Sequence, residues 1–513
     1  MSIDSVQKLT IDELTAFCKR KGFVYPSSEI YGGLGGLWDY GHLGTLVKHN
    51  FENLWRKYFL GLQDNFYEIE AAEIMPEKVF VASGHLKNFT DIAARCKKGH
   101  HERADQLLEK NLGKRFEGLS SEELSQEILK HKIVCPVCNA AIEYVGAMNM
   151  MFPIELGSGN AAKAFLRPET AQSPYVNFRL QYEITRGKLP LGLALIGRAY
   201  RNELSPRNML LRQRAFVQAE LQIFFNPSKI NQHEEFEKIK EYSLRVMNSE
   251  KRNKGVQKIS CADIAKHIPK FYVYHMAKVQ QFYLDILGIE EEKFRFYELN
   301  EKERAFYNKY HFDIEVDLGK TGWTEIGGVH YRTDHDLAGH QAISKQNLSV
   351  YDEETKERFV PHVLELSFGV DRNIQALLTF AYEHDTKRDN VVLHLSPQLA
   401  PVKAAVFPIV KNDPAAVKLA RTIFESLSEE FKVEHDNGGS IGRRYARQDE
   451  QGTPYCITVD EDSLKDKNVT IRDRDTTKQI RVKIDALNET LRKLINRKVA
   501  FDKAGKVVET RVK

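Results

Sequence analysis

The sequence predicts an α+β protein made of several domains. Its 513 residues exceed what one hydrophobic core usually serves, so roughly two to four domains are expected. Two strand-like runs, Leu191 to Glu203 and Gln213 to Phe225, alternate in polarity and are joined by a short loop, which predicts an antiparallel hairpin. From about residue 390 onward, strand-like runs alternate with amphipathic helices, which indicates a second, smaller α/β domain.

The composition excludes several classes of protein. Hydrophobic residues make up 42% and charged residues 28% of the chain, and no apolar run approaches the ~20 residues that a bilayer span needs. The N-terminal residues lack the basic and apolar regions of a secretory signal, and six cysteines are too sparse for a disulfide framework. We therefore expect a cytoplasmic protein without a membrane partner. The net charge of +4 neither indicates nor excludes a polyanionic partner.

The N-terminal region predicts a helix, a glycine-rich stretch, a second helix and a strand. The helices are expected near Ile11–Lys21 and over Leu46–Leu60, and the strand over Phe66–Ile74. Between the helices, residues 31 to 41 contain glycines without the spacing of a dinucleotide-binding or P-loop motif, so close backbone packing is their expected use. The aromatic second helix followed by a strand could build a dimer seam.

Residues 96–145 change in character and suggest an insertion. They are rich in Lys, Glu and His, and a helical tract separates two cysteine sites. Cys135 and Cys138 form a CxxC pair, and Cys96 with His100 or His101 could complete a tetrahedral zinc site. Because there is no second CxxC pair, reduced thiols remain an alternative to structural zinc. The expected ligands are Cys96, His100, Cys135 and Cys138.

The predicted hairpin carries a polar floor. At strand period two, Arg201 and Glu203 share one face of the first run. One face of the second run carries Arg214, Phe216, Gln218, Glu220 and Gln222, and its opposite face is apolar. Such a floor suits a nucleotide, because arginine binds phosphate, an aromatic ring stacks on a base and a carboxylate accepts a hydrogen bond from an exocyclic amine. The alternative is an ordinary hairpin with one solvated face.

A third polar strand precedes a helix near residue 372. Period two places Glu365 and Ser367 on one face, Gly369 permits close approach, and Arg372 lies at the expected helix start. A carboxylate and an arginine in this position can ligate Mg²⁺ and hold a terminal phosphate. By itself the pattern would also fit an ordinary strand-to-helix turn.

Five segments together carry a resemblance to a known family. They are LRPETAQ at 166–172, RNELSPRN at 201–208, GWTE at 322–325 with RTDHDL at 332–337, ELSFGVDR at 365–372, and IGRRYARQDE at 441–450 continuing to GTP at 452–454. In this order they resemble class II aminoacyl-tRNA synthetases, and specifically the dimeric type of glycyl-tRNA synthetase, over nearly all the chain. The resemblance implies an antiparallel catalytic sheet flanked by helices, with helical insertions and a C-terminal α/β anticodon-binding domain.

The resemblance also implies a division of the chain into six segments. They are catalytic core with a dimer-forming motif at 1–95, a possibly zinc-binding insertion at 96–145, core with the ATP-binding hairpin at 146–225, a helical insertion at 226–315, core at 316–386, and the anticodon-binding domain at 387–513. The expected partners are glycine, ATP, glycine tRNA and a second copy of the chain.

The implied activity is that of a glycine–tRNA ligase. Such an enzyme activates glycine with ATP and Mg²⁺ to glycyl-adenylate and transfers the glycyl group to the 3′ end of the tRNA. Carried over by residue, the catalytic groups are Arg201 for the α-phosphate, Glu203 for the adenine amine and Arg372 for the γ-phosphate. The full ATP-binding set is Arg201, Asn202, Glu203, Arg212, Phe216, Glu325, Glu365, Gly369 and Arg372.

For glycine, the resemblance points to both charged ends of the amino acid. Glu169, Glu220 and Ser367 would surround the ammonium group and α-carbon, and Arg332 would pair with the carboxylate. Glu365 would bind either Mg²⁺ or glycine, and the sequence does not separate these two roles.

Alternatives remain open. A synthetase of the same subclass for another amino acid would share the fold, and a non-catalytic synthetase-like accessory protein that binds tRNA or another nucleic acid would be expected to lack Arg201 or Arg372. In the C-terminal domain, arginines could contact phosphates or anticodon bases, or form a solvated salt-bridge surface. These are Arg443, Arg444, Arg447, Arg472 and Arg474.

Overall fold

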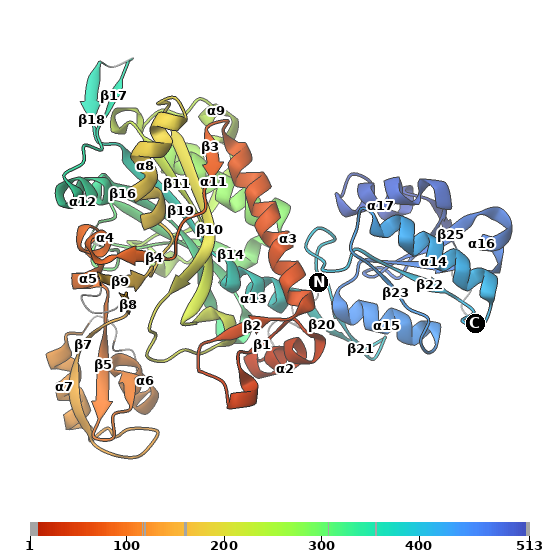
Figure 1. The fold of residues 1–513 in the computed structure, drawn as a ribbon, viewed down its shortest axis with the longest axis horizontal. Coiled ribbons are helices and arrows are strands. Elements are labelled where there is room, and N and C mark those ends of the chain that lie inside the picture. Colours follow the sequence, from red (N-terminus) through yellow and green to blue (C-terminus); the bar gives the residue numbers. More distant parts are fainter. Residues whose placement is uncertain are drawn as a thin grey trace.

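The computed structural model describes residues 9–114, 116, 119–157, 162–305, 307–353 and 356–508. They form a main body around a nine-stranded sheet, a small lobe that projects from this body, and a C-terminal domain (Figure 1). Within these ranges, no helix has both the length and the apolar composition that crossing a bilayer requires.

The central sheet has the strand order β13-β12-β14-β15-β16-β19-β11-β10-β3. Its neighbours run antiparallel, except for the parallel pairs of β10 with β3 and of β12 with β14. The strands that carry the site are β10 (Leu191–Tyr200), β11 (Ala215–Phe225), β15 (Tyr310–Asp317), β16 (Trp323–Thr333) and β19 (His362–Gly369). The others are β3 (Phe66–Glu68), β12 (Ser243–Met247), β13 (Gln257–Ser260) and β14 (Phe294–Glu298).

The register of the sheet confirms the predicted hairpin and adds β19 beside it. Ala199 of β10 lies opposite Phe216 of β11, and Glu220 of β11 lies opposite Ser367 of β19. Because alternate residues of a strand share a face, the polar side chains of β11 and β19 gather on one side of the sheet. The other side belongs to the main hydrophobic core, through Val217, Ala219, Leu221, Ile223, Leu364, Leu366 and Phe368.

Helix α3 (His42–Phe59) joins this core by its aromatic face. Trp55 is fully buried with its ring centroid 5.9 Å from that of Phe368, and the Phe59 ring lies 5.0 Å from that of Phe282. The expected helix is confirmed and begins four residues earlier, at His42 instead of Leu46. At the end of the glycine-rich stretch, a Cβ on Gly41 would lie 2.3 Å from the carbonyl oxygen of Gly22, so this glycine serves close packing, as expected.

The helix-and-strand pattern proposed as a dimer seam is used differently. The aromatic face of α3 is covered by residues of the same chain, because the sheet offers it an apolar surface. The single strand expected over Phe66–Ile74 is two short strands, β3 and β4 (Ile74–Pro76), which join different sheets. The aromatic face of α3 is therefore part of the main core, and the dimer seam stays a prediction.

The segment 226–315 is not the purely helical insertion that was predicted. It contains α9 (Phe236–Ile239), α10 (Cys261–Ile264) and α11 (Lys270–Gln281), but also β12, β13, β14 and the start of β15, which continue the central sheet. The strands β12, β13 and β14 are short, and β15 (Tyr310–Asp317) carries charges on alternate residues, so their length and polarity obscured the strand pattern. The segment extends the central sheet and adds three helices to the main body.

The small lobe (residues 90–149) has a sheet and a core of its own. Its sheet contains β5 (Thr90–Cys96), β6 (His101–Arg103) and β7 (Ile142–Asn149), with α6 (Ala104–Leu112) and α7 (Ser121–Lys130) packed beside it. It stands apart from the central sheet in Figure 1. The lobe begins at the start of β5, before the expected boundary at residue 96.

The C-terminal domain is the α/β unit that the alternation predicted. Its six-stranded sheet has the order β23-β22-β24-β25-β26-β27 and a separate hydrophobic core. The strands are β22 (Ala404–Pro408), β23 (Val433–His435), β24 (Tyr455–Val459), β25 (Asn468–Asp473), β26 (Gln479–Lys483) and β27 (Lys506–Val508). The helices are α14 (Pro414–Ser428), α15 (Ile441–Gln451), α16 (Glu461–Asp466) and α17 (Leu487–Ile495), and the hairpin of β20 (Tyr382–Asp385) and β21 (Asn390–Leu393) leads into the domain.

Several further elements border the site. Helix α13 (Val370–Ala381) follows β19 directly, and α8 (Gln172–Ile184) packs against α12 (His335–Ser344). At the N-terminus, α2 (Ile11–Lys21) has the predicted bounds, with a capping box between Thr10 and Glu13 and a left-handed Gly22 at its end. The remaining elements are β1 (Val24–Pro26), β2 (Trp38–Tyr40), α4 (Glu77–Ala82), α5 (His85–Asn88), β8 (Phe152–Leu156), β9 (Ala162–Leu166), β17 (Val350–Asp352) and β18 (Glu357–Phe359).

Candidate active site and metal centre

A cavity of about 320 Å³ lies over the polar face of β11, β16 and β19. It brings together all of the predicted ATP-binding and glycine-binding residues except Asn202. Those lining it are Glu169, Arg201, Glu203, Arg212, Phe216, Glu220, Glu325, Arg332, Glu365, Ser367, Gly369 and Arg372. Asn202 does not line the cavity, but its backbone N–H donates to Met150 O at 2.7 Å and so holds the chain between Arg201 and Glu203.

At one end of the cavity, the residues after β10 form a compact arrangement. The Arg201 guanidinium lies 5.1 Å above the centre of the Phe216 ring and donates to Pro168 O at 3.0 Å. The Glu203 carboxylate accepts a hydrogen bond from Arg212 Nε at 2.7 Å. An arginine stacked on an aromatic ring and a nearby carboxylate are the groups that the sequence predicted for a nucleotide, and the tertiary structure places them side by side.

Arg372 is held at the start of α13 by backbone and carboxylate contacts. Its Nη1 lies 3.0 Å from Glu325 Oε1, and its Nε donates to Leu211 O at 3.1 Å. The neighbouring Asp371 was not predicted. Its buried carboxylate accepts hydrogen bonds from the Tyr40 hydroxyl and from the Val217 backbone N–H, which ties α13 to β11.

At the other end of the cavity, carboxylates gather on β11 and β19. Ser367 Oγ donates to Glu220 Oε1 at 2.9 Å, as expected from their opposed positions. Gln222 Nε2 donates to Glu365 Oε2 at 2.8 Å, and the Tyr175 hydroxyl donates to Gln222 Oε1 at 2.7 Å. These contacts fix the carboxylates in a buried site, where their interaction with a cation is strong.

Arg332 lines the cavity and is engaged by carboxylates of its own chain. It is buried, donates to both carboxylate oxygens of Asp336 at 2.8 and 3.1 Å, and reaches Glu365 at 3.2 Å and Glu169 at 3.4 Å. Because a buried guanidinium needs anionic partners, these carboxylates neutralise it within the protein. The structure thus engages Arg332 with three carboxylates of its own chain, and Asp336 is a partner that the sequence reasoning missed.

The carboxyl groups of this end differ in their proton affinity. Burial raises the pKa of Glu220 to about 8, and the negative charges of Glu365 and Glu169 add to this effect. Burial also opposes ionisation of Glu365, but Arg332 and His330 outweigh it and hold the pKa of Glu365 at about 2. For Glu169, His85 and Arg332 likewise overcome burial and lower the pKa. Near neutral pH these charges therefore favour ionised Glu169 and Glu365 beside a Glu220 that holds its proton more strongly.

Two histidines in the cavity were not predicted. His330 Nδ1 lies within hydrogen-bonding distance of Glu365 Oε1, and His330 Nε2 lies 3.0 Å from His311 Nε2, which is 2.9 Å from Asp313 Oδ1. A signal was present in the sequence, since period two places His330 on the same face as Arg332 and His311 on the same face as Asp313.

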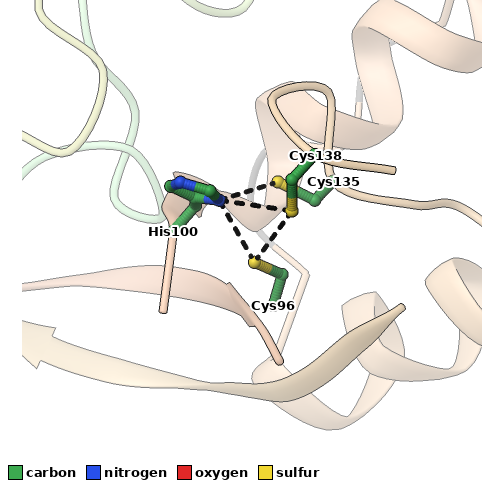
Figure 2. Close-up of side chains that lie close together, drawn as sticks. All are labelled: Cys96, His100, Cys135 and Cys138. Atoms are coloured by element: carbon green, nitrogen blue, oxygen red, sulfur yellow. Dashed lines mark hydrogen bonds between the residues drawn. The ribbon is translucent and has the colours of Figure 1, made fainter. Parts of the chain in front are cut away.

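The four predicted metal ligands of the small lobe converge (Figure 2). The sulfur atoms of Cys96 and Cys138 lie 3.7 Å apart, and His100 Nδ1 lies 3.5, 3.7 and 3.3 Å from the sulfurs of Cys96, Cys135 and Cys138. Tetrahedral zinc with ordinary bond lengths would separate two sulfurs by ~3.8 Å and a sulfur from a nitrogen by ~3.6 Å. The four side chains therefore have the spacing and the donor set of a tetrahedral metal site. His101, the other histidine considered, is exposed at the start of β6.

Three of the five C-terminal arginines are structural. Arg444 donates to Pro408 O and Ile409 O, and Arg474 to Gly452 O and Leu395 O. Arg472 makes a bidentate pair with Asp449. All three are buried by the domain's own chain, so they do not form the solvated salt-bridge surface that the sequence left open, and their guanidinium groups are engaged within the domain. Of the five, Arg443 and Arg447 are exposed.

The two larger units of the chain match known family models. A model described as tRNA synthetase class II core domain (G, H, P, S and T) matches residues 154–380, and one described as anticodon binding domain matches residues 403–494.

Curated relatives match nearly the whole chain. A glycine–tRNA ligase of Thermococcus sibiricus is 38% identical, with 94% of this chain and 98% of the relative covered. One from Pyrococcus furiosus is 37% identical over 93% and 97%, and one from Methanothrix thermoacetophila is 35% identical over 97% and 99%. Among solved structures, prolyl-tRNA synthetase from Cryptosporidium parvum, complexed with L-proline and AMP, matches with a TM-score of 0.57 and 12% identity, covering 96% of this chain and 78% of that one. That structural likeness concerns the fold.

Proposed function

Since this chain belongs to the glycine–tRNA ligase family of class II aminoacyl-tRNA synthetases, it is an aminoacyl-tRNA ligase, and we propose how its cavity carries out the reaction. The enzyme activates glycine with ATP to glycyl-adenylate and transfers the glycyl group to the 3′ end of glycine tRNA. The observation that carries the proposal is the cavity itself, because stacked Arg201 and Phe216 line one end and buried carboxylates line the other.

The end of the cavity near Arg201 and Arg372 suits ATP. Phe216 would stack on adenine, Glu203 would accept from its exocyclic amine, and Arg201 and Arg372 would pair with the α- and γ-phosphates. In the structure Arg212 pairs with Glu203, so we propose that ATP separates them and frees Arg212 for the pyrophosphate arm. Glu325 and Glu365 are the carboxylates that would hold Mg²⁺, which neutralises phosphate charge when it is bound with ATP.

The carboxylate end suits the ammonium group of glycine. Glu169 offers buried negative charge, Glu220 offers a second carboxyl group that becomes negative when it ionises, and Ser367 orients the carboxyl group of Glu220. Glycine has no side chain to bind, so selection falls on its charged end and on the exclusion of larger amino acids. The contacts of Arg332 favour a role in holding Glu169 and Glu365 over the predicted pairing with the carboxylate of glycine.

The reaction needs no side-chain nucleophile. The glycine carboxylate attacks the α-phosphorus in line and releases pyrophosphate, and the terminal ribose hydroxyl of the tRNA then displaces AMP. We propose that the cavity accelerates the first step by placing the two substrates together and by opposing the growing negative charge with Arg201.

The test is amino-acid-dependent exchange of labelled pyrophosphate into ATP, without tRNA. We expect exchange with glycine and none with alanine, serine, threonine, proline or histidine. Exchange with one of the other amino acids would refute the assignment of the carboxylate end. Absence of exchange with any of them, in a folded protein that binds tRNA, would favour the non-catalytic accessory protein.

We further propose a structural zinc ion, a homodimer and a cytoplasmic location. Cys96, His100, Cys135 and Cys138 would hold zinc, which would close the far end of the small lobe. Metal analysis of the purified protein tests this, with Cys138→Ser expected to lower the zinc content.

The homodimer is supported by the resemblance, and light scattering coupled to size exclusion tests it. We also propose that the C-terminal domain contacts the anticodon. Of the five predicted arginines, Arg443 and Arg447 are exposed and would take part in this contact.

A further inference from the structure

The small lobe contacts the hairpin loop of the cavity through residues that the reaction scheme does not include. Its two connections to the main body are the residues that flank it, Phe89 and Met150. The Arg201 guanidinium lies 5.3 Å above the Phe89 ring. Where the chain leaves the lobe, the carbonyl of Met150 accepts a hydrogen bond from the Asn202 N–H at 2.7 Å. The base of the lobe is therefore in contact with the hairpin loop (residues 201–214).

Two side-chain contacts extend this interface along the hairpin loop. Asp91 Oδ2 on β5 lies 3.4 Å from Arg212 Nη2, and Ser205 Oγ donates to Glu102 Oε2 on β6 at 2.6 Å. Asp91 is itself held by Arg103 of β6, at 3.3 Å, and Arg103 pairs with Asp105. Both strands thus present a carboxylate to the loop at the end that faces the cavity.

The same two strands carry the metal-type cluster at their other end. β5 (Thr90–Cys96) carries Asp91 near its start and Cys96 at its end, and β6 begins directly after His100 and ends at Arg103. Asp91 and Cys96 are five residues apart, which in a strand is about 17 Å. The cluster therefore does not reach the cavity, but it joins the ends of the two strands that contact the hairpin loop.

The charges around Arg212 indicate what this contact achieves. Arg212 lies between two carboxylates, at 2.6 Å from Glu203 and 3.4 Å from Asp91. When Glu203 turns to a bound nucleotide, Asp91 remains as the anion beside Arg212. A guanidinium that keeps one fixed partner loses less conformational freedom when it binds a phosphate, so the second carboxylate prepares Arg212 for its ligand.

We propose that the small lobe positions the hairpin loop for ATP, with Asp91 and Arg103 as the positioning residues that hold Arg212. This inference rests on the proposed assignment of the cavity to ATP. Neither Asp91 nor Arg103 lines the cavity, so their effect is exerted through Arg212.

The experiment compares Asp91→Asn with Glu143→Gln, which removes an exposed charge from the neighbouring strand β7. Glycine-dependent pyrophosphate exchange is measured as a function of ATP and of glycine, and the binding of α,β-methylene-ATP is measured by calorimetry without glycine. We expect Asp91→Asn to raise the KM for ATP and the dissociation constant of the analogue about five- to tenfold, and to leave the KM for glycine within about twofold. Glu143→Gln should change none of these constants.

Zinc content and thermal unfolding show whether Asp91→Asn still folds. If it does not, Ser205→Ala removes the Glu102 contact from the side of the loop and should raise the KM for ATP about two- to threefold. A folded Asp91→Asn that matches Glu143→Gln in ATP-analogue binding would overturn the inference, as would an equal rise in both KM values. A wild-type protein that binds the analogue but shows no glycine-dependent exchange would refute the proposed function instead, while the calorimetric comparison still decides the role of Asp91.

Discussion

Arginine side chains have different environments, and therefore different roles, in the cavity and in the C-terminal domain. In the cavity, Arg201 lies over Phe216 and Arg372 is partly exposed beside Glu325, so both guanidinium groups border open space. In the C-terminal domain, Arg444 and Arg474 are 1% exposed and donate to backbone carbonyls. An arginine-rich motif therefore does not by itself indicate a binding surface. The partners that the fold supplies decide whether the charge is available to a ligand.

The largest expected effect comes from Arg201→Ala. Loss of a charge-assisted hydrogen bond to the α-phosphate costs roughly 1.5 to 3 kcal/mol of transition-state stabilisation. The rate of glycine-dependent pyrophosphate exchange should therefore fall by up to about 100-fold. The thermal unfolding temperature should stay close to that of the wild type, because Arg201 borders the cavity. Arg198→Ala, which removes an exposed arginine of β10, is the matched control. Near wild-type exchange by Arg201→Ala would break the comparison.

The reverse result is expected for Arg444→Met in the C-terminal domain. Removing this guanidinium leaves the buried carbonyl oxygen of Pro408 and the partly buried one of Ile409 without their donor, which should lower the free energy of unfolding of the domain by about 2 to 3 kcal/mol. Denaturant unfolding followed by circular dichroism measures it. Pyrophosphate exchange should persist, because Arg444 is remote from the cavity. An unchanged stability would show that the buried hydrogen bonds contribute little.

Carboxylates extend the comparison, because Asp449 is paired with Arg472 whereas Glu220 is buried among other carboxylates. With a pKa of about 8, the ionised fraction of Glu220 in the empty site rises as the pH increases from 7 to 8.5. Only the ionised form attracts the ammonium group of glycine. The KM for glycine should therefore fall about five- to tenfold over this range, as measured by pyrophosphate exchange at saturating ATP.

Glu220→Gln is the control for that pH dependence. It keeps a group that can bond to Ser367 but cannot ionise, so it should raise the KM for glycine and make it independent of pH over the same range. A variant that keeps the wild-type pH profile would assign the titration to another group.

The smallest effect on stability is expected for Arg447→Ala. Its side chain is 43% exposed and pairs with Asp436, and such surface pairs contribute about 0 to 1 kcal/mol. Denaturant unfolding should therefore barely change, and pyrophosphate exchange should not change at all. If Arg447 contacts tRNA, the KM for glycine tRNA in aminoacylation should rise. A stability loss as large as that of Arg444→Met would remove the distinction between exposed and buried arginines.

Local periodicity predicted much of the fold. The bounds of α2, the hairpin of β10 and β11, and the alternation in the C-terminal domain follow from patterns within single segments. The segment 226–315 was misjudged because short strands with alternating charges resemble helix-rich surface segments, and only pairing with the central sheet shows their conformation. The dimer seam stays a prediction, because an aromatic helix face does not indicate whether its own chain or another chain covers it, and the aromatic face of α3 is covered by its own chain.

The sequence by itself determined which residues can meet across the sheet and which four side chains can hold a metal, since strand period and ligand type are local properties. Only the tertiary structure decided what those residues do there. It surrounded Arg332 with three carboxylates, buried Arg444, and placed Asp91 of the small lobe beside Arg212. These contacts join segments that are far apart in the chain, and burial and charge at such contacts set the pKa of Glu220 and the availability of each arginine.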